Sequence, residues 1–200
     1  KKNKYIIIKK AISEELSKFC YEYFMMKRQV ARTMFDTRYI SQFTEYFGVW
    51  NDQQVPETYS HYSDIVMETL LVKLLPIMEK ETKLKLNPNY SYARIYKKGD
   101  VLHRHKDRFS CEISTTMHLG GGCWPIYLEP DASQGGVDEK TGNYKASKSK
   151  GVKVMLEPGD MLVYRGNELE HWRDKLTFDD CGQVFLHYNN VETKGSKENI

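Results

Sequence analysis

The 200-residue chain is long enough for one domain with a sizeable core. Hydrophobic residues make up 40% and charged residues 28%, an ordinary globular mixture, and the net charge of +3 at pH 7 falls short of the clustered basic face that nucleic-acid binding requires. No apolar run approaches the ~18 residues of a membrane span, and the start of the chain has too few apolar residues for a signal peptide. We therefore expect a cytoplasmic protein with neither a membrane nor a nucleic-acid partner.

The four cysteines are far apart in the sequence: Cys20, Cys111, Cys123 and Cys181. None forms a CxxC pair, which disfavours a structural zinc site. Since no secretion signal is present, we expect reduced thiols rather than two disulfides.

The N-terminal part predicts a strand followed by a helix. Tyr5–Ile8 is a short β-branched run typical of a strand. Ser13, followed by two acidic residues, has the pattern of a helix N-cap. The helix is expected over about 13–27, because apolar residues recur there on one face: Leu16, Phe19, Cys20, Tyr23 and Phe24.

The next segment carries weaker signals. Residues 28–57 contain aromatic side chains but show no clear period. A second helix is expected over about 63–80, where Pro76 can kink or shorten it.

From about residue 90 the pattern changes to short strands separated by turns. Gly120-Gly121-Gly122 is expected to end one strand, and residues 130–151, with almost no apolar side chains, are expected to form a long loop. Such strands favour a sandwich or barrel with the two helices packed on one outer face. We therefore expect a single α+β domain over 1–200, with a helical flank and first strand over 1–89 and a mainly β core over 90–190. The expected strands of the core are 91–96, 111–119, 123–129, 152–156, 161–164 and 183–188.

The most informative local motif is His105-Lys106-Asp107. In an extended segment, residues i and i+2 project from the same face, so His105 and Asp107 could bind one ion together. Two histidines and one carboxylate that leave positions open are the ligand set of non-haem Fe(II) oxygenases. A third ligand must come from elsewhere in the chain.

A series of motifs surrounds this one in a specific order. Tyr96 and Gly99 precede it, a strand ending in Gly120-Gly121-Gly122 and a further strand follow it, and a Pro-x-x-Gly-Asp-hydrophobic hairpin ends at Tyr164. The order resembles the 2-oxoglutarate/Fe(II) dioxygenase family, in particular its prolyl-4-hydroxylase-like branch, over about 90–190. The resemblance implies a double-stranded β-helix, which is a jelly-roll or cupin-type barrel. It also implies three metal ligands: His105, Asp107 and His171.

The other histidines are given non-ligand roles. His103 shares a face with His105 but lacks an Asp two residues later, so we expect it to support the site or to face solvent. His118 and His187 lie inside strand patterns and are expected to be packed or hydrogen-bonded.

The resemblance also implies 2-oxoglutarate as co-substrate, whose far carboxylate needs a buried cation. Where the family has a basic residue on its last strand, this chain has Gln183. Arg173 is the first substitute because it follows His171 by two residues and shares its face in a strand, while Arg94 and Arg108 remain alternatives. Tyr96 is expected to donate to the same carboxylate.

The implied reaction couples oxidative decarboxylation of 2-oxoglutarate to substrate hydroxylation, with O2 and Fe(II) and with ascorbate as a candidate reductant. Peptidyl proline is a substrate by analogy only, and the primary substrate can be a protein or a small molecule. Trp124, Trp172 and Arg108 are the candidate substrate-binding residues. The loop over 131–151 can be a lid or a solvated insertion.

Two other readings stay open. His103-Arg104-His105 with Glu112 loosely resembles the ligand set of cupin-like metalloproteins. Alternatively, the missing basic residue at Gln183 could mark a non-catalytic barrel that binds a ligand or a partner.

Overall fold

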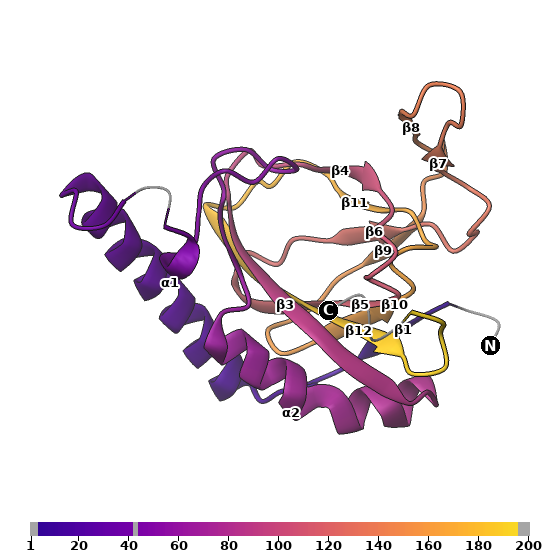
Figure 1. The fold of residues 1–200 in the computed structure, drawn as a ribbon, viewed down its shortest axis with the longest axis horizontal. Helices are drawn as coiled ribbons and strands as arrows, with labels where there is room; N and C mark the ends of the chain where they lie inside the picture. Colours follow the sequence, from indigo (N-terminus) through magenta and orange to yellow (C-terminus); the bar gives the residue numbers. More distant parts are fainter. Residues whose placement is uncertain (1–3, 42–43, 196–200) are drawn as a thin grey trace.

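Two β-sheets and two long helices make up the fold in the computed structural model, which describes residues 4–41 and 44–195. Figure 1 shows the sheets facing one another, with both helices beneath the larger sheet. Helix α1 contacts β5, and helix α2 contacts β3 and β12, all of them strands of the larger sheet. The expected mainly β fold with helices packed on one sheet is therefore confirmed.

The larger sheet has six antiparallel strands in the order β1-β10-β5-β12-β3-β2. Strand β5 ends at Gly121, within the Gly120-Gly121-Gly122 run that was expected to end a strand, although it continues two residues beyond the expected Leu119. A Cβ at Gly120 would lie 2.7 Å from the ring of Tyr21, so the missing side chain leaves room for helix α1. The strands are β1 (Tyr5–Ile8), β10 (Met161–Tyr164), β5 (Ile113–Gly121), β12 (Asp180–Asn190), β3 (Leu86–Lys97) and β2 (Tyr59–Tyr62).

The smaller sheet has four strands in the order β4-β11-β6-β9. They are β4 (Leu102–His105), β11 (His171–Arg173), β6 (Ile126–Leu128) and β9 (Val152–Val154). The expected loop over 130–151 contains a two-stranded hairpin, β7 (Gly136–Val137) and β8 (Tyr144–Lys145). Glu170 fixes this segment, because its carboxylate accepts hydrogen bonds from the Tyr144 hydroxyl and from the Ser147 amide and hydroxyl.

Helix α1 spans Glu14–Asp36 and α2 spans Ile65–Thr82, with a short 3-10 helix η1 at Glu45–Phe47. Ser13 caps α1 as expected, since its hydroxyl accepts from the Leu16 amide at 3.2 Å. The expected end of α1 near residue 27 is wrong. After residue 27, helix α1 extends beyond the sheets, and Ala31 is the one buried residue of this part (Figure 1). The spacing of apolar residues that predicted the helix is therefore lost there, although the helix continues.

Side chains of the central strand β12 alternate between the two faces of the larger sheet and therefore join two different hydrophobic clusters. Val184 and Leu186 face the helices and join a cluster with Phe24 and Leu71. Phe185 points the other way, into the space between the sheets, as the period of two requires. The interior between the sheets therefore receives the remaining odd-numbered side chains of β12.

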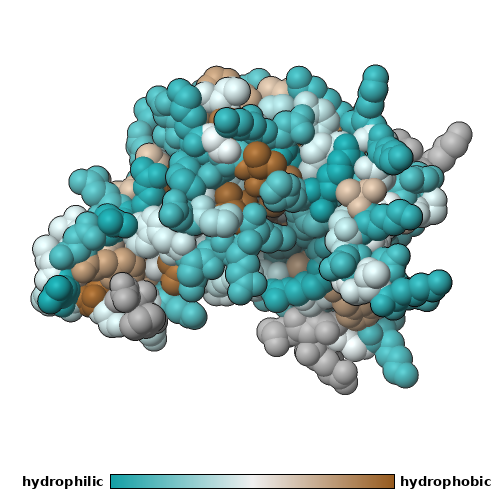
Figure 2. Space-filling model, turned by 90° about the horizontal axis from the view of Figure 1, so that it is seen from above, coloured by the Kyte–Doolittle hydropathy of each residue, from teal (hydrophilic) through white to brown (hydrophobic). Residues whose placement is uncertain are grey.

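The face of the molecule in Figure 2 is mostly hydrophilic, and its hydrophobic side chains form small groups. In the described part of the chain, no helix has the combination of length and apolar character needed to cross a membrane. All four cysteines are unpaired, as expected.

Asp64 ties the two helices together. Its side chain caps α2 by accepting from the amides of Val66 (3.0 Å) and Met67 (3.3 Å). It also accepts from the Tyr23 hydroxyl of α1 at 2.8 Å and pairs with Lys27. Burial raises the pKa of Asp64, but hydrogen bonds from Lys27 and Tyr23 outweigh it and lower the pKa overall.

Asp64→Ala should lower the free energy of unfolding by about 2–4 kcal/mol, because it leaves the half-buried ammonium of Lys27 and the Tyr23 hydroxyl without this partner and removes a helix cap. Urea unfolding followed by circular dichroism measures this change. Asp36→Ala is the matched control, since it breaks an exposed pair with Arg32 and should cost less than about 1 kcal/mol. Equal losses in the two variants would contradict the proposed role of Asp64.

Candidate functional site

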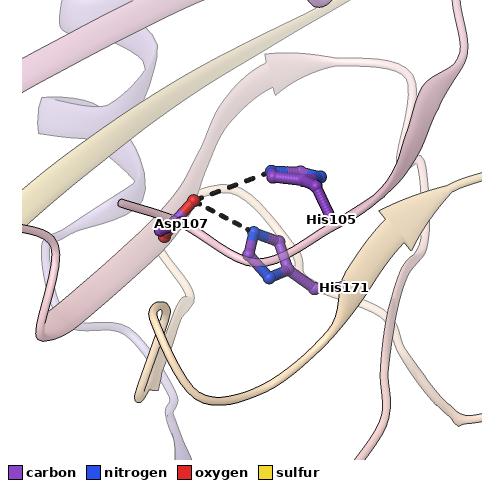
Figure 3. A group of neighbouring side chains, drawn as sticks. All are labelled: His105, Asp107 and His171. Carbon is purple, nitrogen blue, oxygen red and sulfur yellow. Dashed lines mark ion pairs between the residues drawn. The ribbon is translucent and has the colours of Figure 1, made fainter. Parts of the chain in front are cut away.

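Three side chains converge between the sheets: His105, Asp107 and His171. His105 ends β4 and His171 begins β11, and the two residues are direct partners across the antiparallel pair. Asp107 follows β4, and its Oδ1 atom lies 3.6 Å from Nε2 of His105 and 3.4 Å from Nε2 of His171. Figure 3 shows both imidazoles turned toward this carboxylate oxygen.

The outer nitrogens of both imidazoles fix their tautomers. Nδ1 of His105 lies 2.8 Å from the carbonyl oxygen of His103, and Nδ1 of His171 lies 2.9 Å from that of Leu169. A carbonyl only accepts, so each Nδ1 must carry a proton, and each ring then has its other nitrogen, Nε2, turned toward Asp107. Two imidazole nitrogens and a carboxylate oxygen that converge in this way, with each imidazole held by a carbonyl at its other nitrogen, suit a metal ion.

The ionisation of these groups agrees with that geometry. Burial and, to a smaller extent, the neighbouring His171 lower the pKa of His105 to about 4. Burial raises the pKa of Asp107, but the effect of His171 outweighs it, and the pKa is lowered overall. At neutral pH His105 is therefore neutral and Asp107 is ionised, the forms in which both can bind a metal.

The second oxygen of Asp107 is held by groups that sequence analysis did not identify. Ser114 donates to Oδ2 at 2.7 Å, and the Asp107 amide donates to the carbonyl of Gly166 at 2.9 Å. A Cβ at Gly166 would lie 2.2 Å from both Asp107 Oδ2 and Ser114 Oγ, so only glycine leaves room for this bond. Since Ser114 has one proton, the 3.2 Å contact of its hydroxyl with Nδ1 of His187 requires His187 to donate.

A second group of possible ligand atoms consists of Asp107, Cys111 and His187. It shares Asp107 with the first group, and the outer oxygen of that carboxylate already accepts from Ser114. Only the first group therefore has all its ligand atoms available.

The cupin-like ligand set is not assembled. His103 is exposed, and the buried carboxylate of Glu112 pairs with Arg165 at 3.0 Å. His118 is buried and bonded to the side-chain amide of Gln183 at 3.0 Å, in agreement with its expected structural role.

A cavity of about 210 Å³ opens beside the three converging side chains. Aromatic residues of the larger sheet line it, among them Tyr90, Tyr92, Tyr164 and Phe185. Arg94 and Arg108 also line it. Trp124 and Trp172, which were predicted to bind substrate, are not among the described residues that line this cavity.

The two tryptophans pack elsewhere. Trp124 lies edge-on to Tyr96, with ring centroids 4.9 Å apart. Trp172 follows the inward-facing His171 in β11 and therefore points to the opposite face of the smaller sheet. Its ring stacks on Tyr127, and the Arg104 guanidinium lies 3.4 Å from its ring centroid. Both therefore have structural contacts in this structure.

Arg94 and Arg173 are both buried but differ in their partners. Arg94 forms an ion pair with Asp52 at 2.6 Å and donates to Gln54 at 2.7 Å and to the Tyr96 hydroxyl at 3.1 Å. Its charge is thus compensated within the protein. Asp52 lies in the segment that showed no periodic pattern, so this pairing was not visible in the sequence.

Arg173 has no carboxylate partner among the described residues. It is 1% exposed and donates to the Trp124 carbonyl and, at 3.1 Å, to Thr116, while its Nε atom has no partner. Burial lowers the pKa of Arg173. A buried guanidinium without an anion is unfavourable, which points to an anionic ligand. Arg173 is not among the described residues that line the cavity.

Gln183 belongs to the surroundings of Arg173. Its amide oxygen accepts from the Thr116 hydroxyl at 3.0 Å, and that hydroxyl accepts from Arg173. The residue at the expected basic position therefore contacts Arg173 through one intervening side chain.

Comparisons with known proteins identify the fold. No family model matches the sequence, and no curated protein matches it either. Among solved structures, a prolyl-4-hydroxylase of Pseudomonas putida matches with a TM-score of 0.62 and 13% identity, covering 94% of this chain and 93% of the other. HygX from Streptomyces hygroscopicus, with nickel, 2-oxoglutarate and hygromycin B bound, matches with a TM-score of 0.64 and 14% identity, covering 96% and 84%.

The viral collagen prolyl hydroxylase of Paramecium bursaria Chlorella virus-1, in complex with 2-oxoglutarate, matches with a TM-score of 0.57 and 10% identity, covering 94% and 97%. At these identities the comparisons establish the fold. The predicted resemblance to 2-oxoglutarate/Fe(II) oxygenases, prolyl-4-hydroxylases included, is confirmed at that level.

The contrast between the two arginines predicts opposite effects on stability. Arg94→Met should lower the free energy of unfolding by about 3–5 kcal/mol, because it leaves the buried carboxylate of Asp52 unpaired. Arg173→Met should change the free energy of unfolding by less than about 1 kcal/mol or raise it, because it removes a buried charge that has no carboxylate partner among the described residues. Urea unfolding of the ligand-free proteins measures both. A large loss in Arg173→Met would assign Arg173 a purely structural role.

Proposed function

We propose that this protein is an Fe(II)- and 2-oxoglutarate-dependent oxygenase built on a double-stranded β-helix. The supporting observation is the convergence of Asp107 Oδ1 with two imidazole nitrogens, each turned toward it by a carbonyl that holds the other ring nitrogen. The single domain consists of the helical flank over 1–89 and the β core over 90–190. Within this core the two facing sheets hold the site between them.

His105, Asp107 and His171 hold the metal in this proposal. Two histidines and one carboxylate suit Fe(II) and leave coordination positions open for other ligands. The donor set fits, since His105 is neutral, Asp107 is ionised and Ser114 keeps the Asp107 carboxylate turned so that one oxygen faces the metal. The bound nickel and 2-oxoglutarate in the structurally similar HygX support the same assignment here.

Arg173 binds the far carboxylate of 2-oxoglutarate. The co-substrate is a dianion, and a metal at the triad neutralises only one end of it. The buried guanidinium of Arg173 has an unused Nε and no carboxylate partner in the described chain, so it can supply the missing charge. Arg94 is a weaker candidate because Asp52 already neutralises it. Reaching Arg173 requires an opening in the present cavity wall.

The reaction is the hydroxylation of an organic substrate. When bound, Fe(II) and 2-oxoglutarate supply the oxidising chemistry, with decarboxylation of the keto acid coupled to oxygen transfer. The chain positions both groups and excludes bulk water from the interior between its sheets. Peptidyl proline is the substrate suggested by analogy, and Arg108 and the aromatic lining of the cavity are the groups placed to contact a substrate.

The protein should bind one Mn(II), an unreactive substitute for Fe(II), per chain. His105→Ala, Asp107→Ala and His171→Ala should each abolish tight binding, because each removes one of three ligand atoms. Isothermal titration calorimetry measures the stoichiometry and affinity. His103→Ala is the control, since His103 is exposed and lies outside the triad. Undiminished binding by His171→Ala would remove His171 from the ligand set.

Arg173→Ala should raise the 2-oxoglutarate concentration needed for half-maximal succinate formation by a few hundred-fold or more. Removing one partner of a buried ion pair costs about 3–5 kcal/mol. Gln183→Ala is the matched control, since a neutral hydrogen bond is worth about 1 kcal/mol, or less than about tenfold. Mn(II) binding should be unchanged in both. Normal co-substrate use by Arg173→Ala would move the assignment to Arg94 or Arg108. Metal and 2-oxoglutarate binding without succinate formation by the unaltered protein would indicate a non-catalytic binding protein.

A further inference from the structure

Tyr164 carries a hydroxyl group that the ligand-free protein does not use. The residue ends β10, is 3% exposed and lines the same cavity as the metal triad. Among the described residues, no hydrogen-bond partner reaches its phenol oxygen, whereas the hydroxyls of Tyr90 and Tyr92 in the same cavity contact Cys111 and Asp52. The phenol oxygen is not among the fully buried polar atoms of the described residues that lack a partner, so it is open to the cavity, where a ligand oxygen can accept a hydrogen bond from it.

The position of Tyr164 favours the metal end of the interior. Across the β10–β5 pair, Tyr164 lies opposite Ser114, the residue that holds the Asp107 carboxylate. Thr116, which contacts Arg173, lies opposite Leu162, two residues further along the strand. The Tyr164 ring also meets the ring of His171 edge-on, with centroids 4.8 Å apart. The phenol therefore lies next to two of the three proposed metal ligands.

The identity of this residue is also informative. A phenylalanine in its place would fill the same volume and keep the contact with His171. The hydroxyl is therefore the part of the side chain that is available to bind a ligand in the cavity.

We propose that the Tyr164 hydroxyl donates a hydrogen bond to an oxygen at the metal-bound end of 2-oxoglutarate, an inference that rests on the proposed function. Burial raises the pKa of Tyr164 well above its ordinary value, so the phenol keeps its proton at neutral pH and can donate it. The carboxylate and keto oxygens of the ligand can only accept. Tyr164 thereby orients the chelating end of the co-substrate, while Arg173 holds the other end.

Tyr164→Phe and Tyr188→Phe provide a matched test, since each removes one buried phenol oxygen. The Tyr188 hydroxyl is engaged in the helix-facing core, where it donates to the Leu71 carbonyl at 2.8 Å. With Mn(II)-loaded protein, Tyr164→Phe should weaken 2-oxoglutarate binding by roughly ten- to a hundred-fold, the effect of a hydrogen bond to a charged acceptor. Tyr188→Phe should leave this affinity unchanged. Isothermal titration calorimetry gives both values.

The stability of the ligand-free proteins should change in the opposite sense. Tyr164→Phe should keep or raise the midpoint of thermal unfolding, because no protein partner loses a hydrogen bond, and Tyr188→Phe should lower it. Unchanged 2-oxoglutarate affinity in Tyr164→Phe would overturn the proposal. If the midpoint of thermal unfolding is also lowered, the hydroxyl has a structural role instead. If the unaltered protein binds Mn(II) but no 2-oxoglutarate, the proposed function itself fails.

A spectroscopic measurement tests which end of the ligand is contacted. Without oxygen, the charge-transfer absorption between Fe(II) and the bound keto acid responds to hydrogen bonds at the chelating end. Its maximum should shift in Tyr164→Phe and stay in place in Tyr188→Phe, both measured at saturating 2-oxoglutarate. An unshifted maximum combined with weakened binding would overturn the assignment to the metal-bound end.

Discussion

The convergence of a carboxylate oxygen and two imidazole nitrogens is the constraint on which the site depends. Other contacts hold Oδ1 of Asp107 and the two Nε2 atoms in place. Backbone carbonyls fix the two imidazoles, and Ser114 fixes the carboxylate. The folded chain thus positions the three atoms before any ligand is bound, which is the arrangement expected of the metal site that we propose.

Charge in the rest of the interior follows the same logic. Two buried arginines project between the sheets, but Asp52 neutralises Arg94 and leaves Arg173 without a carboxylate. A metal at the triad would add a second uncompensated positive centre. An elongated dianion is the ligand that satisfies both centres at once, because an isolated buried charge is far more costly than a paired one.

Local patterns in the sequence predicted the features that depend on residues close together in the chain. The His105–Asp107 spacing, the Ser13 cap and strand β10 needed only neighbouring residues. The last turns of α1 were missed because little of that part is buried, and strand β2 was missed because only four residues pair with β3. Ser114 and Gly166 could not be identified from local patterns, since their contacts with Asp107 join segments that are distant in the sequence.

The absence of a basic residue at position 183 follows from the presence of Arg173. The guanidinium of Arg173 donates to Thr116, the Thr116 proton goes to the Gln183 carbonyl oxygen, and the Gln183 amide donates to Nδ1 of His118. Each of these three donors has an acceptor, while Nε of Arg173 has none among the described residues. A lysine or arginine at 183 would remove the acceptor for Thr116 and place a second cation near the first in a buried site, where like charges are costly. With Arg173 as the proposed cation on β11, position 183 on β12 needs a neutral residue that both donates and accepts, and glutamine meets that requirement.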